Sequence, residues 1–572
     1  MKKKNKEIFK TLITPYAEKM DKDCPWNEYP RPSMVRDSFI CLNGKWDFAV
    51  TDGDLNPEFK DEILVPFAPE SYLSGIEKSI AEGSVMHYRR SFRADDVPSG
   101  YRVILHFGAV DAVCTVYVNG REAMRHEGGY LPFSADVTDM LTGGENELYV
   151  KAVDDLLLDY PYGKQRRERG GMWYTTVSGI WQTVWLEYVP KNHVKRLKIT
   201  PSMTNVKIEV SGGEAHKRLT LLDDGSVIEF DGGEITITPN EIKLWTPEEP
   251  NLYRFTLECG DDLVESYFAL REIGTGMVNG VPRILLNGKP YLFNGLLDQG
   301  YFPDGIFLPA TSEGFRDDIL ATKRLGFNML RKHIKVEPEI FYYLCDTLGM
   351  AVFQDMVNNS GYSYIFDTVL PTIGMKRFPD KHLHADTRTR AIFEEHMYGT
   401  MEHLYSFPSI VYYTIFNEGW GQFRADEMYE KAKAKDGTRV IDATSGWFVR
   451  SKSDVDSRHV YFKKVKLGRV SDRPIVISEF GGYSHRVDGH LFGAENYGYS
   501  IHESEESFRD AFGKLYSDEI LPLIKGGISA LVYTQLTDVE DETNGLLTYD
   551  RRHTKLDEGK TTQIMNELYK QI

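Results

Sequence analysis

The pattern of apolar and polar positions divides the chain into two parts. Up to about residue 272, short stretches of alternating apolar and polar residues, such as 103–107 and 113–118, are separated by Asn-Gly, Asp-Gly and Gly-Gly turns. Alternation with period two predicts strands that bury one face. Beyond residue 287, continuous apolar runs alternate with stretches of helical period, which predicts parallel strands covered by helices.

The first part predicts two all-β domains. Residues 1–190 show strand after strand without helical periodicity, which favours a sandwich or jelly roll. The stretch 113–118, the turn Asn119-Gly120 and the residues from Arg121 onward predict a hairpin. Residues 191–273 continue in short strands and have the length of a small immunoglobulin-like sandwich.

The second part, residues 274–572, predicts a TIM (β/α)8 barrel. Eight strands are expected at 291–296, 328–332, 350–355, 410–416, 439–443, 459–462, 475–478 and 528–534. Helices are expected at 313–325, 338–348, 386–405, 424–435, 505–524 and 558–569. Residues 446–473 lack a helical pattern, so an open doubly wound sheet stays as the alternative.

Two of the expected barrel strands run directly into a glutamate. Residues 410–416 lead to Asn417 and Glu418, and residues 475–478 lead to Glu479, each followed closely by glycine. Barrel enzymes place catalytic groups at the carboxyl ends of their strands, and a pair of carboxylates suits glycoside hydrolysis. A single such glutamate would more simply be a strand-end partner in a salt bridge, but two in matching positions favour catalysis.

Other polar and aromatic side chains fall at the same edge of the barrel. Asn417 could bind a sugar hydroxyl and Trp420 could stack on a sugar ring, or they could bond the backbone and pack the rim. Each further candidate has the alternative of a buried ion pair or a satisfied histidine. By strand order these candidates for sugar binding are Asp298, Arg331, His333, Asp355, Trp447, His459, Tyr461, Gln535 and Asp538.

Composition excludes several classes of function. The formal net charge of −17 disfavours nucleic acid as a partner. The five cysteines are scattered without metal-ligand spacing, which is typical of reduced thiols. The N-terminal lysines precede no apolar core of a secretory leader, and no apolar stretch is long enough to cross a membrane, so a cytoplasmic protein without membrane contact is expected.

Several motifs in the same order resemble glycoside hydrolase family 2, which includes β-galactosidases, β-glucuronidases and β-mannosidases. The resemblance covers nearly the whole chain. It is carried by Phe416-Asn-Glu-Gly-Trp420, Ser478-Glu-Phe-Gly481, Leu42-Asn-Gly-Lys-Trp46, Ser178-Gly-Ile-Trp-Gln-Thr-Val-Trp185, Leu244-Trp-Thr-Pro-Glu-Glu-Pro-Asn-Leu-Tyr253 and Thr537-Asp-Val-Glu-Asp-Glu-Thr-Asn-Gly545. It implies a jelly roll, an immunoglobulin-like sandwich and a TIM barrel.

The resemblance also implies a retaining mechanism, with Glu418 as acid/base and Glu479 as nucleophile. Retention predicts carboxyl groups about 5–5.5 Å apart. Positions like His333 and Tyr461 lie in or beside the sugar site of the family, and we rank these two and Asp298 first among the remaining candidates. The substrate is then a small glycoside or oligosaccharide, and assembly into a homo-oligomer is left open.

Departures from the family pattern bear on the substrate. The asparagine of the stretch 540–547 is not followed two residues later by the lysine with which family β-glucuronidases hold a sugar carboxylate. The acidic residues there are expected to disfavour a uronic acid. A neutral sugar is therefore favoured, a β-galactoside first, with β-glucuronidase and arabinosidase or galactofuranosidase activity as alternatives.

Two readings from other classes remain. Residues 353–359 replace the Glu-x-His with which large family β-galactosidases bind magnesium, so no metal or other cofactor is expected. A metal-assisted hydrolase would have only His382 and His384 as a candidate pair. A non-catalytic carbohydrate-binding protein is the other alternative. Segments 357–385 and 483–504, with help from jelly-roll loops or a second subunit, are expected to border the site.

Overall fold

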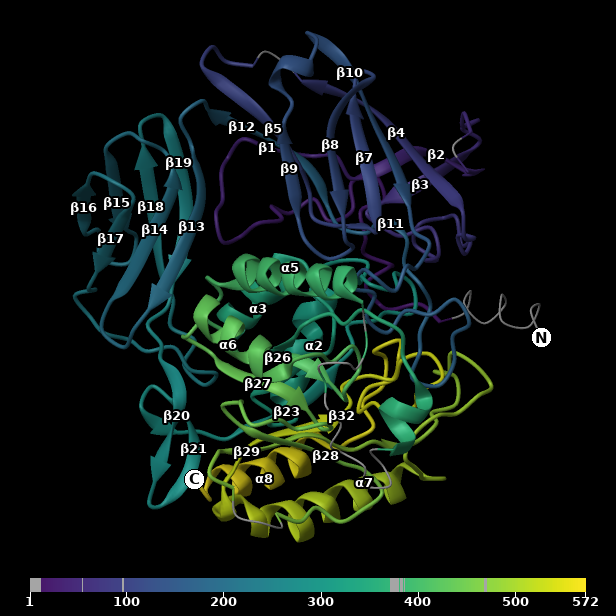
Figure 1. Ribbon diagram of the computed structural model, residues 1–572, viewed down its shortest axis with the longest axis vertical. Coiled ribbons are helices and arrows are strands. Elements are labelled where there is room, and N and C mark those ends of the chain that lie inside the picture. The colour runs from purple at the N-terminus through teal and green to yellow at the C-terminus, as the bar shows by residue number, and fades with distance from the viewer. Residues whose placement is uncertain are drawn as a thin grey trace.

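A computed structural model describes residues 12–53, 55–94, 97–370, 380, 384, 386–467 and 471–572. The N-terminal residues 1–11 and His382 lie outside the described residues. Figure 1 shows an N-terminal β-sandwich in purple and blue, a smaller teal sandwich beside it, and a helix-covered barrel in green and yellow below both. The three-part architecture predicted from the sequence pattern is confirmed.

The N-terminal sandwich packs a four-stranded sheet, order β1-β12-β5-β9, against a six-stranded sheet, order β3-β2-β4-β10-β7-β8. Both sheets contribute apolar side chains, such as Trp46 and Leu105, to one core. The strands β7 and β8 pair antiparallel across the turn at Asn119 and Gly120, which confirms the predicted hairpin. The elements are β1 Phe39–Cys41, β2 Gly44–Asp52, β3 Asp61–Val65, β4 Ser84–Ala94, β5 Tyr101–Phe107, β6 Val110–Asp111, β7 Val113–Val118, β8 Arg121–Glu127, β9 Phe133–Asp136, η1 Thr138–Met140, β10 Gly144–Val153, β11 Gly179–Ile180 and β12 Val184–Pro190.

The second sandwich has a three-stranded sheet, order β13-β14-β17, and a four-stranded sheet, order β16-β15-β18-β19. Alternate residues such as Val206, Ile208 and Leu257 are buried in a shared core, as the period-two pattern predicted. The strands are β13 Val194–Pro201, β14 Val206–Gly212, β15 Lys217–Leu221, β16 Val227–Phe230, β17 Glu234–Ile237, β18 Tyr253–Cys259 and β19 Asp262–Phe268. The division of the chain at residues 190 and 273 stays a proposal.

The barrel is an eight-stranded parallel sheet of order β27-β26-β25-β24-β23-β32-β29-β28. An antiparallel sheet, β20-β21-β22, precedes it, and Ile284 and Leu286 of that sheet pack against Phe293 and Val440 of the barrel strands. The strands are β20 Ile273–Val278, β21 Val281–Leu286, β22 Lys289–Pro290, β23 Phe293–Asp298, β24 Met329–Lys332, β25 Ala351–Asp355, β26 Ile410–Asn417, β27 Val440–Ser445, β28 Asp456–Val460, β29 Ile475–Gly481, β30 Tyr483–Ser484, β31 Ser500–Ile501 and β32 Ile528–Thr534.

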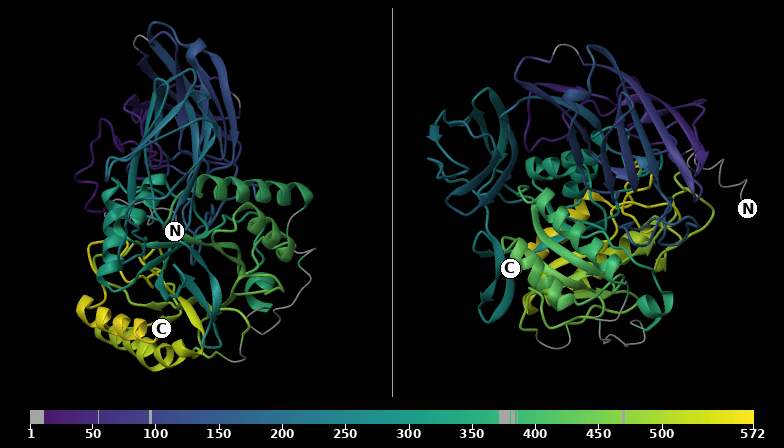
Figure 2. Two further views of the ribbon diagram at one scale, coloured as in Figure 1. Left: turned by 90° about the vertical axis from the view of Figure 1, so that its left-hand side faces the viewer. Right: turned by 45° about the horizontal axis from the view of Figure 1, so that its top comes forward.

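The helices lie outside the barrel strands, and α5 lies between the barrel and the two sandwiches (Figures 1 and 2). The predicted helix 505–524 is α-helical only from Glu505 to Lys514; wider and then tighter helical turns follow, and Pro522 lies in the first turn of the last of them, where no amide hydrogen is needed. The helical elements are α2 Glu313–Arg324, α3 Glu339–Leu348, η2 Tyr364–Val369, α5 Thr387–Leu404, α6 Ala425–Lys435, α7 Glu505–Lys514, η3 Leu515–Ile520, η4 Leu521–Gly526 and α8 Glu558–Tyr569.

The seam of the barrel lies between β27 and β28, which are the two edge strands of the eight-stranded sheet. The sixth strand was predicted at 459–462 but runs from Asp456 to Val460. The difference arises because Asp456–Arg458 is polar in sequence yet pairs with the buried β29. The shift places His459 inside the strand and Tyr461 just beyond it.

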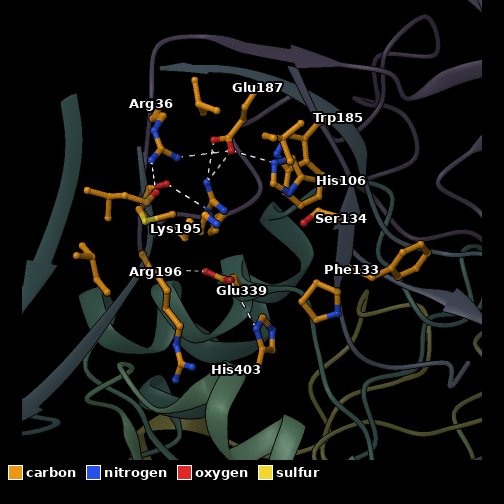
Figure 3. Close-up of a pocket in the computed structure, with 18 of the residues that line it drawn as sticks. Arg36, His106, Phe133, Ser134, Trp185, Glu187, Lys195, Arg196, Glu339 and His403 are labelled. Carbon is orange, nitrogen blue, oxygen red and sulfur yellow. Dashed lines mark hydrogen bonds and ion pairs between the residues drawn. The ribbon is translucent and has the colours of Figure 1, made fainter. Parts of the chain in front are cut away.

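The three domains meet at a joint built around Glu187 of β12. Arg31 donates to both oxygens of the Glu187 carboxylate at 2.8 Å, and His106 Nε2 lies 3.0 Å from Oε2. Figure 3 shows this cluster above Glu339 and His403, which belong to the barrel helices α3 and α5. A cavity of about 680 Å³ opens between these groups.

None of the helices among the described residues has the length and apolar character needed to cross a membrane.

Candidate active site

The two glutamates singled out in the sequence lie at the same rim of the barrel. Glu418 directly follows β26, and Glu479 lies near the carboxyl end of β29. β26 ends at Asn417, and Glu418 adopts φ 52°, in the left-handed region that side chains other than glycine rarely occupy. A Cβ on the following Gly419 would lie 2.2 Å from the Phe448 ring, so only glycine fits there. The chain therefore turns sharply at Glu418 and presents its carboxylate at the end of the strand.

Arg331 of β24 ties four strand ends together inside the barrel. Its Nε lies 3.0 Å from Asp355 Oδ1, its Nη2 donates to Asn417 Oδ1 at 2.8 Å, and its Nη1 lies 3.2 Å from Glu479 Oε1. Nη1 also donates to the carbonyl oxygen of Ser478 at 2.9 Å. The rigid fork of donors suits this role, since one guanidinium can hold several acceptors at fixed angles.

Glu479 is held as an ionised carboxylate. The Tyr461 hydroxyl donates to Glu479 Oε2 at 2.6 Å, and the same hydroxyl lies 2.8 Å from Thr534 Oγ1. Burial opposes ionisation, but the neighbouring His459, the charge of Arg331 and the Tyr461 hydroxyl outweigh it and lower the pKa of the Glu479 carboxyl. A carboxylate that stays charged and fixed at neutral pH is suited to nucleophilic attack.

Glu418 is the more accessible of the pair. Its side chain is 24% exposed, against 7% for that of Glu479. Its Oε1 lies 2.8 Å from His459 Nδ1, and no described residue forms a hydrogen bond with Oε2. One carboxylate oxygen of Glu418, one of Glu479 and a nitrogen of His459 all lie within 4.8 Å of one another.

Two of the predicted sugar-binding residues lie at the carboxyl ends of barrel strands: Asp298 ends β23, and His333 directly follows β24. His333 Nδ1 lies 2.8 Å from Asp355 Oδ2, and both side chains are almost completely buried. Asp298 Oδ2 accepts from Lys332 at 2.6 Å, within a buried charge network that includes Glu337. The structure brings these residues to the rim, and their contact with a sugar stays a prediction.

The candidates after the eighth barrel strand are buried and hydrogen-bonded to other side chains of the protein. Gln535 is fully buried and donates to Glu542 Oε2 at 3.0 Å and to Asn544 Oδ1 at 2.8 Å. Asp538 accepts from Lys555 at 2.7 Å, and burial, opposed by Lys555, raises the pKa of Asp538 to about 6. Their sugar-binding role also stays a prediction.

The two tryptophans lie on different sides of the site. Trp420 is 4% exposed and meets Trp173 and Tyr162 of the N-terminal domain edge to face, at ring distances of 4.9 Å and 5.5 Å. Trp447 is half-buried, with its ring 5.6 Å from that of His459. Trp420 thus joins two domains, whereas Trp447 lies beside His459, the neighbour of Glu418 and Glu479.

An N-terminal loop reaches the barrel rim and covers the acidic stretch there. Glu540 accepts from the Thr175 amide at 2.8 Å, and Arg169 lies 3.3 Å from Asp541 Oδ2. The Tyr174 hydroxyl donates to Glu542 Oε2 at 2.5 Å. These individual contacts were missed, since the sequence offers only the Gly170-Gly171 turn and the aromatic run after it as a signal.

The expected loop segments are partly described. In segment 483–504, the Tyr499 ring stacks on Tyr461 at 4.0 Å, with an interplanar angle of 13°. Of segment 357–385, residues 371–379, 381–383 and 385 lie outside the described residues. In its described part, Tyr362 packs against Trp173 at 5.0 Å, and His384 Nε2 lies 2.9 Å from Asp367. Segment 483–504 thus reaches Tyr461 beside Glu479, whereas Tyr362 of the other segment contacts the N-terminal domain, and a role of both segments around the sugar stays a prediction.

The group that could surround a metal ion within the described ranges is Glu418, His459 and Glu479. Arg331 Nη1 already lies 3.2 Å from Glu479 Oε1, and its permanent positive charge disfavours a cation beside it. We therefore interpret the three side chains as a proton-transfer cluster rather than as a metal centre.

Comparisons with known families and sequences agree with the geometry. Residues 76–190 match the model described as "Glycosyl hydrolases family 2, sugar binding domain", and residues 279–491 match "Glycosyl hydrolases family 2, TIM barrel domain". A β-galactosidase of Thermoanaerobacter pseudethanolicus is 26% identical over 57% of this chain and 47% of its own length. A β-galactosidase of Pseudoalteromonas haloplanktis is 23% identical over 91% of this chain and 55% of its own length. The chain spans about half the length of these curated relatives.

Among solved structures, the β-D-glucuronidase of Dictyoglomus thermophilum superposes with a TM-score of 0.74. The superposition covers 94% of this chain and 98% of that chain at 18% sequence identity. At that identity the similarity concerns the fold.

Proposed function

Because the chain belongs to family 2 of the glycosyl hydrolases, we propose that it hydrolyses β-glycosides with retention of anomeric configuration. Glu479 is the nucleophile and Glu418 is the acid/base. The observation that carries the proposal is the carboxylate pair at the barrel rim, with one member charged and fixed and the other accessible.

The spacing of the pair supports retention. The carboxylate oxygens of Glu418 and Glu479 approach within 4.8 Å. Retaining enzymes separate the two carboxyl groups by about 5–5.5 Å, whereas inverting enzymes leave about 6.5–9.5 Å for a water molecule.

The environments of the two side chains support the division of roles. Glu479 attacks the anomeric carbon as a carboxylate, while the protonated Glu418 gives its proton to the leaving oxygen. A glycosyl ester on Glu479 results. Glu418, now ionised, takes a proton from water, which attacks the ester and releases the sugar and the Glu479 carboxylate. Arg331 and Tyr461 hold the Glu479 oxygens in position throughout.

Trapping the ester tests the mechanism. A sugar fluorinated at position 2, with a good leaving group, should inactivate the enzyme, and peptide mapping should find the label on Glu479. Glu418→Ala should regain turnover with azide on a substrate with a good leaving group, since azide needs no general base. A label on another residue, or inactivation without a label, contradicts the assignment.

For the sugar, we propose a β-galactoside first. The curated relatives named above are β-galactosidases, and the stretch after β32 lacks the asparagine–lysine spacing expected for uronic acids. The other neutral-sugar candidates, arabinosides and galactofuranosides, differ from it in ring size and substituents rather than in charge.

A β-uronide is the second candidate. The expectation that the acidic residues after β32 would repel a uronic acid is weakened by how those residues are held. The acidic side chains at Glu540–Glu542 are buried and held by the N-terminal loop, and burial, opposed by Arg169, raises the pKa of Glu540 to about 7. Lys164 of that loop is close enough for its charge to oppose the rise that burial causes in the pKa of Glu542. The N-terminal domain thus offers a cation near the rim.

A panel of nitrophenyl β-glycosides decides between these sugars. The β-galactoside should give the highest kcat/KM if the neutral-sugar proposal is right. A higher kcat/KM on a β-glucuronide or β-galacturonide would replace it with the second candidate. Absence of turnover across the panel, together with saccharide binding measured by calorimetry, would favour a carbohydrate-binding protein.

A further inference from the structure

His459 lies between the two catalytic carboxylates and is in contact with both. It belongs to β28, and its side chain has no exposed surface. Its Nδ1 lies 2.8 Å from Glu418 Oε1, and its Nε2 lies 3.6 Å from Glu479 Oε1. A buried imidazole in this place controls how the two carboxylates are oriented.

The protein provides a closely fitting slot for this ring. A Cβ on Gly446 would lie 2.5 Å from the His459 Cγ, so glycine leaves the room that the imidazole fills. The register between β28 and β29 shifts at His459, which places the residue directly beside Glu479 in the ladder. The slot and the shift together fix the ring relative to both strands.

Ser445 links the ring back to Glu418 through the backbone. Its Oγ lies 2.9 Å from His459 Nε2, and its carbonyl oxygen accepts from the Glu418 amide at 2.9 Å. Since Ser445 ends β27 and His459 lies on β28, the contact spans the seam of the barrel. Glu418, Ser445 and His459 form a closed ring of interactions in which each fixes the next.

We propose that His459 is a positioning residue that holds Glu418 Oε1, so that Glu418 Oε2 is the oxygen that exchanges a proton with the leaving group and with water. The inference rests on the proposed function of Glu418. It adds which oxygen carries the proton and which side chain decides this.

One tautomer of the imidazole serves both steps of the reaction. With the proton on Nδ1, His459 donates to Glu418 Oε1, which can accept both as a carbonyl of the acid and as part of the carboxylate. Nε2 then accepts from the Ser445 hydroxyl. The opposite tautomer would set the lone pair of Nδ1 against an ionised Glu418, so the carboxylate selects the productive form, and the Ser445 hydroxyl, which can donate or accept, fits it.

The charged and titratable groups around the ring come from several strands. Glu418 follows β26, Glu479 lies on β29 with Arg331 of β24 beside it, and the Tyr461 ring lies 6.5 Å from that of His459. Tyr461 and Arg331 contact Glu479, whereas His459 forms its hydrogen bond with Glu418. Effects on the acid and on the nucleophile can therefore be separated by variant.

The experiment compares His459→Leu, His459→Asn and Tyr461→Phe on two substrates of the same sugar. A phenyl glycoside needs the acid for its leaving group, whereas a dinitrophenyl glycoside does not. His459→Leu should lower kcat/KM about 10–100-fold on the phenyl glycoside, the value of a hydrogen bond to a charged group, and much less on the dinitrophenyl glycoside.

The other variants make the test specific. His459→Asn, whose amide can donate from near the position of Nδ1, should restore part of the loss on the phenyl glycoside. Tyr461→Phe should affect both substrates alike, since it acts on the nucleophile. The alkaline limb of the kcat/KM profile should move to higher pH in His459→Leu, because the ionised acid has lost a donor.

Equal losses on the two substrates, an unmoved alkaline limb or no recovery in His459→Asn would overturn the inference. Ser445→Ala, which keeps the backbone carbonyl, should show the same substrate dependence to a smaller extent if His459→Leu does not fold. The proposed function fails separately, since the wild-type protein would then show neither turnover nor label on Glu479.

Discussion

Glu187, at the joint between the domains, and Glu479, at the rim of the barrel, are both buried carboxylates held by arginine, histidine and tyrosine side chains. Arg31, His106 and the Tyr29 hydroxyl contact Glu187. Arg331, His459 and Tyr461 take the corresponding places around Glu479. The chemical composition of the two clusters is therefore nearly the same.

The clusters differ in what lies next to the carboxylate. Glu479 has a second carboxylate beside it, Glu418, whose side chain is 24% exposed. Glu187 is 2% exposed at its side chain and is surrounded by cations, with Arg36 at 3.7 Å in addition to Arg31. A single carboxylate whose oxygens are all bound by cationic side chains can hold domains together. A pair of carboxylates with one accessible member can transfer a proton.

The cavity of about 680 Å³ adjoins Glu187, and neither catalytic glutamate lines it. Its walls come from separate domains: β12 on one side, β13 on another and α5 below. Curved domains that meet at a joint leave such space between them. In this protein the cavity therefore marks the joint between the domains, and the paired carboxylates mark the proposed active site.

Replacing Glu479 should have the largest effect on activity. Glu479→Gln keeps the shape of the side chain but removes the attacking carboxylate, so kcat should fall by about 10⁴-fold or more. Steady-state kinetics on the preferred nitrophenyl glycoside measures this. The matched variant Glu187→Gln should keep kcat within about threefold of wild type, because a change away from the reacting atoms leaves the transition state intact. A similar loss in both variants would break the comparison.

Replacing Glu187 should have the largest effect on stability. Glu187→Gln leaves the partly exposed Arg31 and the buried Arg36 without their shared anion, and breaking a buried pair costs about 3–5 kcal/mol of unfolding free energy. Urea unfolding of the two glutamine variants side by side measures the difference. The inference that Glu187 stabilises the joint between the domains is wrong if Glu479→Gln is the less stable of the two variants.

The stabilisation from Glu187 should depend on pH. Burial opposes its ionisation, but Arg31 and its other partners hold the pKa of the folded carboxyl well below its ordinary value of 4.5. Stabilisation from a depressed pKa is complete above the unfolded value and is lost as the pH falls toward the folded value. The difference in unfolding free energy between wild type and Glu187→Gln should thus be constant above about pH 5.5 and shrink below about pH 4.5. A difference that grows on acidification contradicts this.

Tyr461→Phe should have a moderate effect on activity. The variant removes a 2.6 Å hydrogen bond to Glu479 and keeps the ring that stacks on Tyr499. Loss of a hydrogen bond to a charged group lowers kcat/KM by about 10–100-fold. His106 at the joint offers the control: His106→Phe keeps a ring beside Trp185 and should lower stability while sparing kcat/KM.

Lys164→Met should have the smallest effect and sharpens the question of the sugar. If the protein takes a β-uronide, loss of a partly exposed cation near the rim should raise KM by about fivefold, since such charges contribute about 1 kcal/mol. On a β-galactoside KM should stay unchanged. An equal change in KM on both sugars would mean that Lys164 maintains the conformation of the loop and does not bind the charge of the substrate.

The sequence by itself determined the fold and the place of the two glutamates that we propose as the catalytic pair. Continuous apolar runs such as Ile410–Asn417 are buried at every position, as a strand covered on both faces must be. The turn after each run fixes where its carboxylate lies, so Glu418 and Glu479 could be placed on one rim before any contact was known. Periodicity works here because burial on a strand or helix is a local property of the chain.

Tertiary structure alone decided how these carboxylates are held. Arg331 reaches residues 24, 86 and 148 positions away, and Ser445 joins β27 to β28 across the barrel seam. The loop with Tyr174 crosses 368 positions to reach Glu542 and buries a charge that the sequence presents as exposed. Such partners depend on how the barrel closes and how the domains dock, which no local pattern records. The same polar residue types therefore form a joint between domains at Glu187 and the proposed active site at Glu479.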